Sequence, residues 1–166
     1  MKAIRLITII AAFLLFYANG IQAQPTLQNL NQIELHKQFI GTWKCDVAKD
    51  TIIFYEIKPY GTGLEAFMKY VTNGNVYYEQ KRLCGYDKNF DKYIYAYLDK
   101  EGNFGLIAHW FLSKNKLEGV EFSDISNPEK ASWKFEVEFK SPNMYTTVYF
   151  DNNKPVGTTT WTRVKD

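Results

Sequence analysis

The sequence predicts an all-β protein: a single closed antiparallel up-and-down β-barrel of about ten strands, with a short N-terminal helix before it. Three observations predict this fold. Apolar and polar residues alternate from residue 41 onward. Clusters of Asn, Asp and Gly separate the alternating runs. Aromatic residues make up 17% of the chain, a surplus that half-buried strands accommodate well. Closure would remove the exposed edges of such a meander, and a flattened sandwich of the same strands is the alternative.

The first 23 residues have the parts of a secretory signal peptide. Lys2 and Arg5 form a basic start, an apolar run follows to Tyr17, and Ile21-Gln22-Ala23 offers a cleavage site with a small residue. The apolar run is short for a membrane span, and no cysteine for a lipid anchor stands at the cleavage point. We therefore expect an exported protein, periplasmic or secreted, without a stable membrane anchor.

The charge balance argues against nucleic acid as a partner. The formal net charge is +2, and residues 1–23 carry two basic residues and no acidic ones. The remaining chain is therefore formally neutral, so the basic excess belongs to the export signal and not to a binding surface. The chain after residue 23 has a length suited to one domain with one core.

A short polar lead-in precedes the barrel. Residues 24–38 begin with a polar stretch that contains Pro25, and the apolar residues of 33–40 recur near helical spacing. We expect one or two helical turns there, ended by Gly41. The barrel domain is then expected over residues 39–166.

Ten alternating runs predict ten strands. Most turns between them have hairpin chemistry, and only the connection over 123–131 is longer. The expected strands are 41–47, 51–58, 63–71, 75–84, 92–98, 104–112, 116–122, 132–140, 144–151 and 155–164.

Alternation also predicts which side chains face inward. On the eighth strand Trp133, Phe135, Val137 and Phe139 alternate with charged residues, so the aromatic and aliphatic set faces the core. The same reasoning turns the following side chains inward: Ile53, Tyr55 and Ile57; Leu64, Ala66, Met68 and Tyr70; Tyr78, Gln80, Arg82 and Cys84. The fifth and sixth strands are apolar on both faces, so their orientation stays open.

The two ends of the chain are expected to form the seam of the barrel. With an even number of strands, the tenth ends beside the start of the first, antiparallel to it. This places Arg163 at the same end as Trp43, where a guanidinium can stack on the indole and bind nearby carbonyls.

Gly41-Thr42-Trp43 after a short helix, followed by a meander and a late Arg163, resembles the calycin superfamily of lipocalins and fatty-acid-binding proteins. The resemblance extends to bacterial lipocalin-like domains of undefined function. It implies that Gly41, Trp43 and Arg163 close one end of a cup that binds a small apolar or amphipathic molecule. It does not imply which molecule. Nitrobindin-like barrels bind haem through a histidine on a late strand, and the last strands here have none.

Arg82 is the most informative candidate for binding, because it is a charge predicted to point into an aromatic interior. It either meets an anionic ligand, as an inward arginine does in the fatty-acid-type barrels that the chain resembles, or it pairs internally or extends to the rim. The candidate cavity residues are Arg82, Gln80, Tyr78, Tyr55, Met68, Tyr70, Phe135 and Trp133.

Cys45 and Cys84 are both expected inside the barrel near its closed end. They either form a disulfide that joins non-neighbouring strands, or remain two separate buried thiols. No histidine is placed by the sequence to activate either thiol. We expect His36 to be solvated and His109 to be a satisfied core or surface histidine. Tyr93, Tyr95 and Tyr97 line either the cavity or an outer patch.

The sequence contains no catalytic motif and no metal-ligand spacing, so no catalytic residue, metal or cofactor is predicted. We expect a binding protein for a small hydrophobic or amphipathic ligand. The alternatives are a structural or protein-interaction barrel with a filled core, and a haem-binding or isomerase-type barrel. Neither the ligand nor the oligomeric state can be derived from the sequence.

Overall fold

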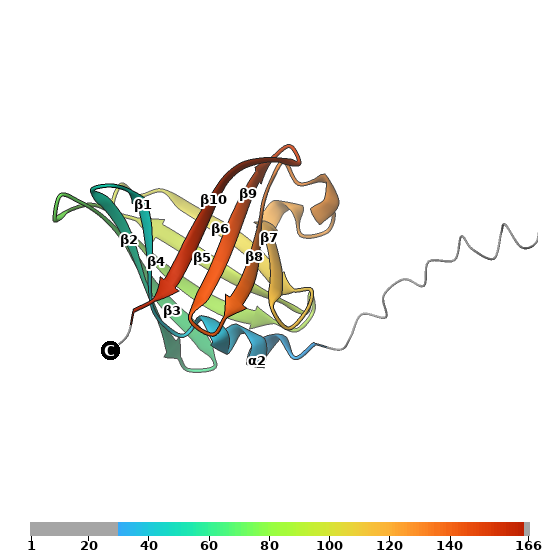
Figure 1. The fold of residues 1–166 in the computed structure, drawn as a ribbon. Coiled ribbons are helices and arrows are strands. Elements are labelled where there is room, and N and C mark those ends of the chain that lie inside the picture. Colours follow the sequence, from blue (N-terminus) through green and yellow to red (C-terminus); the bar gives the residue numbers. More distant parts are fainter. Residues whose placement is uncertain (1–29, 165–166) are drawn as a thin grey trace, which may run out of the picture.

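The computed structural model describes residues 30–164. They form one closed antiparallel barrel of ten strands in chain order, with a short helix at one end (Figure 1). This confirms the predicted fold class. The expected signal peptide and residues 24–29 of the lead-in lie outside the described residues. Within residues 30–164 we find no helix with the length and apolar character needed to cross a membrane.

The strands follow the predicted runs closely. The largest difference is at β4, which continues to Asp87 because its last residues still pair with the start of β5. The strands are β1 (Gly41–Ala48), β2 (Thr51–Tyr60), β3 (Gly63–Thr72), β4 (Asn75–Asp87), β5 (Lys92–Asp99), β6 (Phe104–Phe111), β7 (Lys116–Glu121), β8 (Trp133–Ser141), β9 (Met144–Asp151) and β10 (Lys154–Arg163).

In two hairpins the turn residues have the backbone conformation that the sequence predicted. Asn73 and Gly74 between β3 and β4 both have positive φ, as do Asn152 and Asn153 between β9 and β10. Positive φ at both central residues defines the tight turn whose twist matches paired antiparallel strands, and Asn and Gly adopt it at low cost. These turns fix neighbouring strands next to each other.

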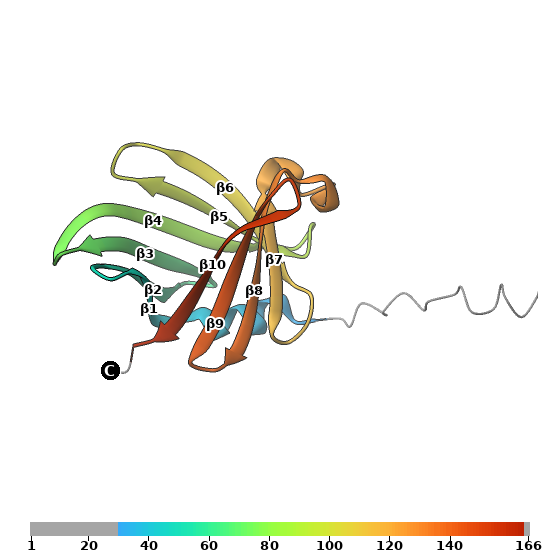
Figure 2. The ribbon, with the colours of Figure 1, turned by 45° about the horizontal axis from the view of Figure 1, so that its top comes forward.

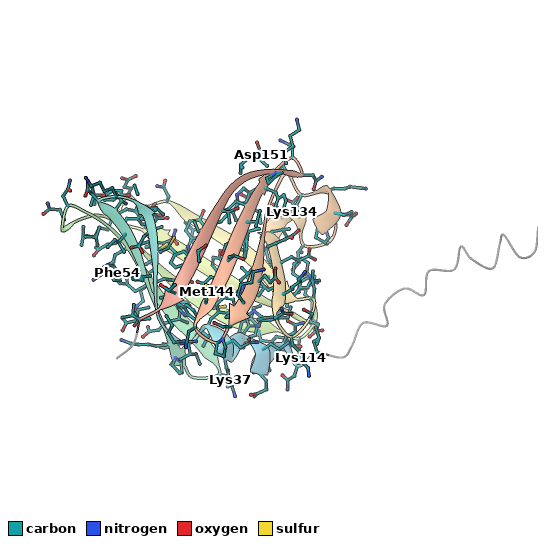
Figure 3. The ribbon with its side chains drawn as sticks, viewed as in Figure 1. Lys37, Phe54, Lys114, Lys134, Met144 and Asp151 are labelled. Atoms are coloured by element: carbon teal, nitrogen blue, oxygen red, sulfur yellow. The ribbon has the colours of Figure 1, made fainter. Side chains whose placement is uncertain are left out.

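The short helix α2 (Gln32–His36) and the 3₁₀ turn η1 (Lys37–Phe39) close one end of the barrel (Figure 1). Asn31 caps the helix by accepting a hydrogen bond from Glu34 N at 3.1 Å. The Gln32 side chain exchanges two hydrogen bonds with the backbone of Phe111, at 2.8 and 3.0 Å. These bonds attach the helix to the end of β6. Figure 3 shows Lys37 and Lys114 at this same end.

The expectation that His36 is solvated is wrong, because the attached helix turns that side chain into the barrel. His36 is 1% exposed and stacks on Tyr93 with ring centroids 3.8 Å apart. Its Nδ1 donates to the carbonyl of Gln32 at 2.7 Å. The local sequence shows only a polar residue in a short helix, and the docking of that helix decides its burial.

The predicted seam is present. Trp43 of β1 is paired with Arg163 of β10, and the guanidinium carbon lies 4.2 Å from the centroid of the fully buried indole. The Trp43 indole N–H donates to Phe39 O at 2.7 Å. Arg163 also donates to the carbonyls of Gln38, Ile40 and Pro142.

The seam is short. β1 and β10 pair at Trp43–Arg163 and Lys44–Thr162, whereas β9 and β10 pair along their whole length. Beyond Lys44 the two strands diverge, as both Figure 1 and Figure 2 show. The closed end of the barrel is therefore tightly fastened, and the seam opens toward the other end.

Candidate functional site

A cavity of about 570 Å³ lies inside the barrel, between the packed closed end and the divergent part of the seam. This volume is within the range of small-molecule sites. The lining consists of His36, Phe39, Val47, Ile53, Tyr55, Ile57, Leu64, Ala66, Met68, Tyr70, Arg82, Cys84, Tyr95, His109, Leu117, Trp133, Phe135, Val137, Tyr145, Thr147, Tyr149, Thr159 and Trp161.

The cavity reaches solvent beside the open part of the seam. Val47 of β1 and Thr159 of β10 line it on the two sides of the seam, beyond the last paired residues. Val47 is 43% exposed although it belongs to the lining. A ligand can therefore approach the cavity between these two strands.

Strand alternation positions most of the lining. Six of the eight candidate residues lie in the cavity wall: Arg82, Tyr55, Met68, Tyr70, Phe135 and Trp133. Gln80 and Tyr78 are not part of the wall. They lie behind Arg82 on the same strand, where Gln80 is buried and its amide donates to the Tyr78 hydroxyl at 3.0 Å. Whether these residues bind a ligand stays a prediction.

The structure also decides the orientation of the two strands that the alternation left open. On β5, Tyr93, Tyr95 and Tyr97 pack toward the interior, and Tyr95 lines the cavity. On β6, His109 faces the same interior. These three tyrosines were predicted to line either the cavity or the outer surface, and the structure has them on the inner side.

Arg82 projects from β4 into the cavity wall and lies between two tyrosine rings. Its guanidinium carbon is 5.0 Å from the ring centroids of both Tyr55 and Tyr95. Its Nε donates to Gln80 Oε1 at 2.5 Å, and its Nη1 donates to the Tyr55 hydroxyl at 3.3 Å. Nη2 meets only the sulfur of Met68, at 3.7 Å, which is a weak acceptor.

Arg82 has neutral partners only. None of the salt bridges found within residues 30–164 includes it. An arginine stays charged under all ordinary conditions, and an enclosed charge without a counter-ion is strongly unfavourable. The site can therefore gain free energy by taking up an anionic group.

Phenol groups surround the same part of the cavity. Burial raises the pKa of Tyr95 and of Tyr145, so both hydroxyls stay protonated and can donate hydrogen bonds. Burial also raises the pKa of Tyr149, whose hydroxyl lies by Thr159. Tyr145 and Tyr149 are not among the cavity residues predicted from the sequence, although both lie at alternating positions of β9 and so share one face.

Cys45 and Cys84 are free thiols in the structure. Of the two predicted alternatives, a disulfide or two separate buried thiols, the structure therefore has the separate thiols. Cys84 lies on the cavity wall with its Sγ 3.5 Å from His109 Nε2. The sequence placed no histidine beside either thiol, whereas the structure places His109 beside Cys84. The pair arises because β5 lies between β4 and β6, and the inward residues of these three strands converge. Local spacing gave no sign of it.

The thiol and the imidazole are both held neutral. Burial raises the pKa of Cys84 to about 12, and burial lowers the pKa of His109 well below its ordinary value. Both groups are therefore neutral where they meet, and no thiolate is available as a nucleophile. His36 lies beside them, with its ring centroid 4.7 Å from that of His109, and its buried Nε2 has no hydrogen-bond partner among the described residues.

Within residues 30–164 no three His, Cys, Asp or Glu side chains come close enough together to hold a metal ion. A scan against models of known protein families found no match. A search of curated proteins likewise found no relative of significant similarity.

Proposed function

We propose that this protein is a calycin-like binding protein, exported from the cell, whose barrel holds a small amphipathic molecule with an anionic group. The observation that carries the proposal is Arg82, a guanidinium at the wall of a mainly apolar and aromatic cavity, for which residues 30–164 provide no carboxylate partner. The anionic group of the ligand contacts Arg82, with phenol hydroxyls such as that of Tyr95 nearby. The apolar part of the ligand lies against the aliphatic and aromatic wall.

Three further features support this assignment. The cavity volume of about 570 Å³ suits a molecule of drug or short-lipid size. The opening beside Val47 provides a route of entry. The Cys84–His109 pair is neutral and therefore not poised for nucleophilic chemistry. Together these features favour binding over catalysis.

The test compares a carboxylic acid of medium chain length with its methyl ester, because esterification removes the charge of the head group and leaves the apolar chain unchanged. Affinities are measured by displacement of a fluorescent anionic probe and checked by calorimetry. The Arg82→Met variant is expected to bind the acid about 10- to 100-fold more weakly, the equivalent of a hydrogen bond to a charged group. Binding of the ester is expected to change little.

Lys58→Met is the matched control. It removes the same charge from an outward position of β2 that faces solvent and contacts Glu56. Its affinity for the acid is expected to equal that of the wild type. Equal loss in both variants, or wild-type affinity in Arg82→Met, would overturn the proposal. A Soret band on addition of hemin that is lost in His109→Ala would assign the cavity to haem instead.

A further inference from the structure

The outer face of β5 and β6 is apolar, although it points away from the cavity. Half of it is covered by the chain itself. The connection between β7 and β8 contains the turns η2 (Phe122–Asp124) and η3 (Pro128–Lys130), and it packs Ile125 and Ala131 against this face. Ala108 beneath them is fully buried. The connection between β7 and β8 therefore forms a small second core with the outer face of β5 and β6.

The other half of this face is bare. Leu98 and Phe104 are paired neighbours on β5 and β6, and they are 53% and 64% exposed. Leu106 pairs with Ala96, and Ala96 pairs with Leu83 of β4. Side chains at paired positions on one face lie about 5 Å apart, so these residues form one continuous surface. We call it the outer patch: Leu83, Ala96, Leu98, Phe104 and Leu106.

The size of the outer patch matches the apolar part of a protein interface. From the exposed fractions, its side chains present on the order of 400 Å² of apolar surface, within the range in which a single patch marks an interaction site. A standard interface buries about 800 Å² per partner, of which roughly 450–500 Å² is apolar. Phe67 of β3 is 38% exposed and pairs with Lys81, and its ring brings the apolar area closer to the apolar part of a standard interface.

The border of the patch carries both signs of charge, already paired. Lys81 contacts Glu65 at 3.6 Å, and Lys100 forms an ion pair with Glu79. A border without net charge offers no attraction to an anionic lipid surface or to a strongly charged partner. The surface that complements a neutral apolar patch with a mixed border is a second copy of the same patch.

We propose that the outer patch is the contact between two copies of this chain, packed face to face across β4, β5 and β6. These strands lie side by side on the wall away from β8 to β10 (Figure 2). Outward residues of β4 alternate with Arg82 and Cys84, which face the cavity. The dimer contact and the ligand site therefore use opposite faces of the same strands, and the dimer leaves the cavity free.

The test is the association state of the protein purified from expression of the full chain. Sedimentation equilibrium at about 100 μM is expected to show a dimer. Leu98→Glu and Phe104→Glu each place a charge on an exposed side chain of the patch, and each is expected to raise the dimer dissociation constant at least about tenfold. Both positions are solvent-exposed in one copy, so the circular dichroism spectrum is expected to stay unchanged, as is ligand binding.

Val156→Glu is the matched control, because Val156 is 63% exposed on β10, outside the patch. It is expected to leave the dimer intact. A wild-type protein that is monomeric at this concentration would overturn the proposal. So would a dimer that survives both patch substitutions, or one that Val156→Glu also dissociates. A monomer that sediments with phosphatidylcholine vesicles, and loses this binding in Leu98→Glu, would assign the patch to a lipid surface instead.

Discussion

Arg163 occupies the space that a side chain at position 41 would need. A Cβ built on Gly41 would overlap Nη1 of Arg163, and Gly41 also has φ +128°, which residues with a side chain rarely adopt. Two independent constraints therefore require glycine at position 41: the space that Arg163 occupies and the backbone conformation. A glycine here lets the Arg163 guanidinium reach the Trp43 ring at the closed end of the barrel.

Replacing Gly41 with alanine is expected to lower the free energy of unfolding by about 2–4 kcal/mol, from backbone strain and displacement of Arg163 together. Gly61→Ala is the control. Gly61 has φ +58° in open space, so it tests the backbone effect alone and is expected to cost about 1–2 kcal/mol. Urea denaturation measures both. Equal losses would show that the contact with Arg163 contributes nothing.

The planar fork of Arg163 matters more than its charge, because it donates to three backbone carbonyls while it stacks on Trp43. Arg163→Lys is therefore expected to destabilise nearly as much as Arg163→Ala, by about 2–4 kcal/mol. Trp43→Ala is expected to cost about 3–5 kcal/mol, since the indole is fully buried.

Lys44→Ala is the control for the seam. Lys44 pairs with Thr162 next to Arg163, but its side chain is 43% exposed and its ammonium group lies 3.6 Å from Asp46, away from the Trp43 ring. Its loss is expected to change stability by less than about 0.5 kcal/mol. If Arg163→Lys kept the melting temperature of the wild type, the planar guanidinium would not be what stabilises the seam.

Buried His36 is expected to make the protein less stable in acid. Burial lowers the pKa of His36 to about 4, below its ordinary value of 6.5. The unfolded chain therefore binds a proton more readily than the folded one between these pKa values. The stability is fully present above pH 6.5 and falls as the pH drops toward 4, by up to about 3 kcal/mol. His109, whose pKa burial also lowers, contributes in the same direction.

Denaturation with urea from pH 4 to 8 measures this dependence. His36→Asn keeps an N–H group that can reach the Gln32 carbonyl and removes the titrating ring. The variant is expected to be less stable at neutral pH and to show a shallower decline in acid. Identical slopes for wild type and variant would show that another group causes the acid sensitivity.

The two cysteines are expected to remain free thiols in the purified protein. Alkylation in denaturant without reductant should add two alkyl groups to the intact mass, whereas a disulfide would block both. In the native protein we expect slow alkylation of Cys84, since burial raises its pKa to about 12 and little thiolate forms near neutral pH. An unmodified mass after denaturation would restore the disulfide alternative.

The sequence determined the barrel because its information is local. Alternation has a period of two, so every strand that is polar on one face shows which face is inward, and turns such as Asn73-Gly74 place consecutive strands side by side. Antiparallel order then brings Trp43 and Arg163 together by counting alone. The same parity placed Arg82 in the cavity wall.

Only the tertiary structure decided what depends on contacts between distant segments. The docking of α2 onto Phe111 buries His36, and the convergence of three strands brings Cys84 to His109. β5 and β6 are apolar on both faces, so their sequence cannot distinguish a cavity wall from an outer patch. Barrel closure assigns one face to the cavity, and the folded-over connection covers half of the other and leaves Leu98 and Phe104 exposed.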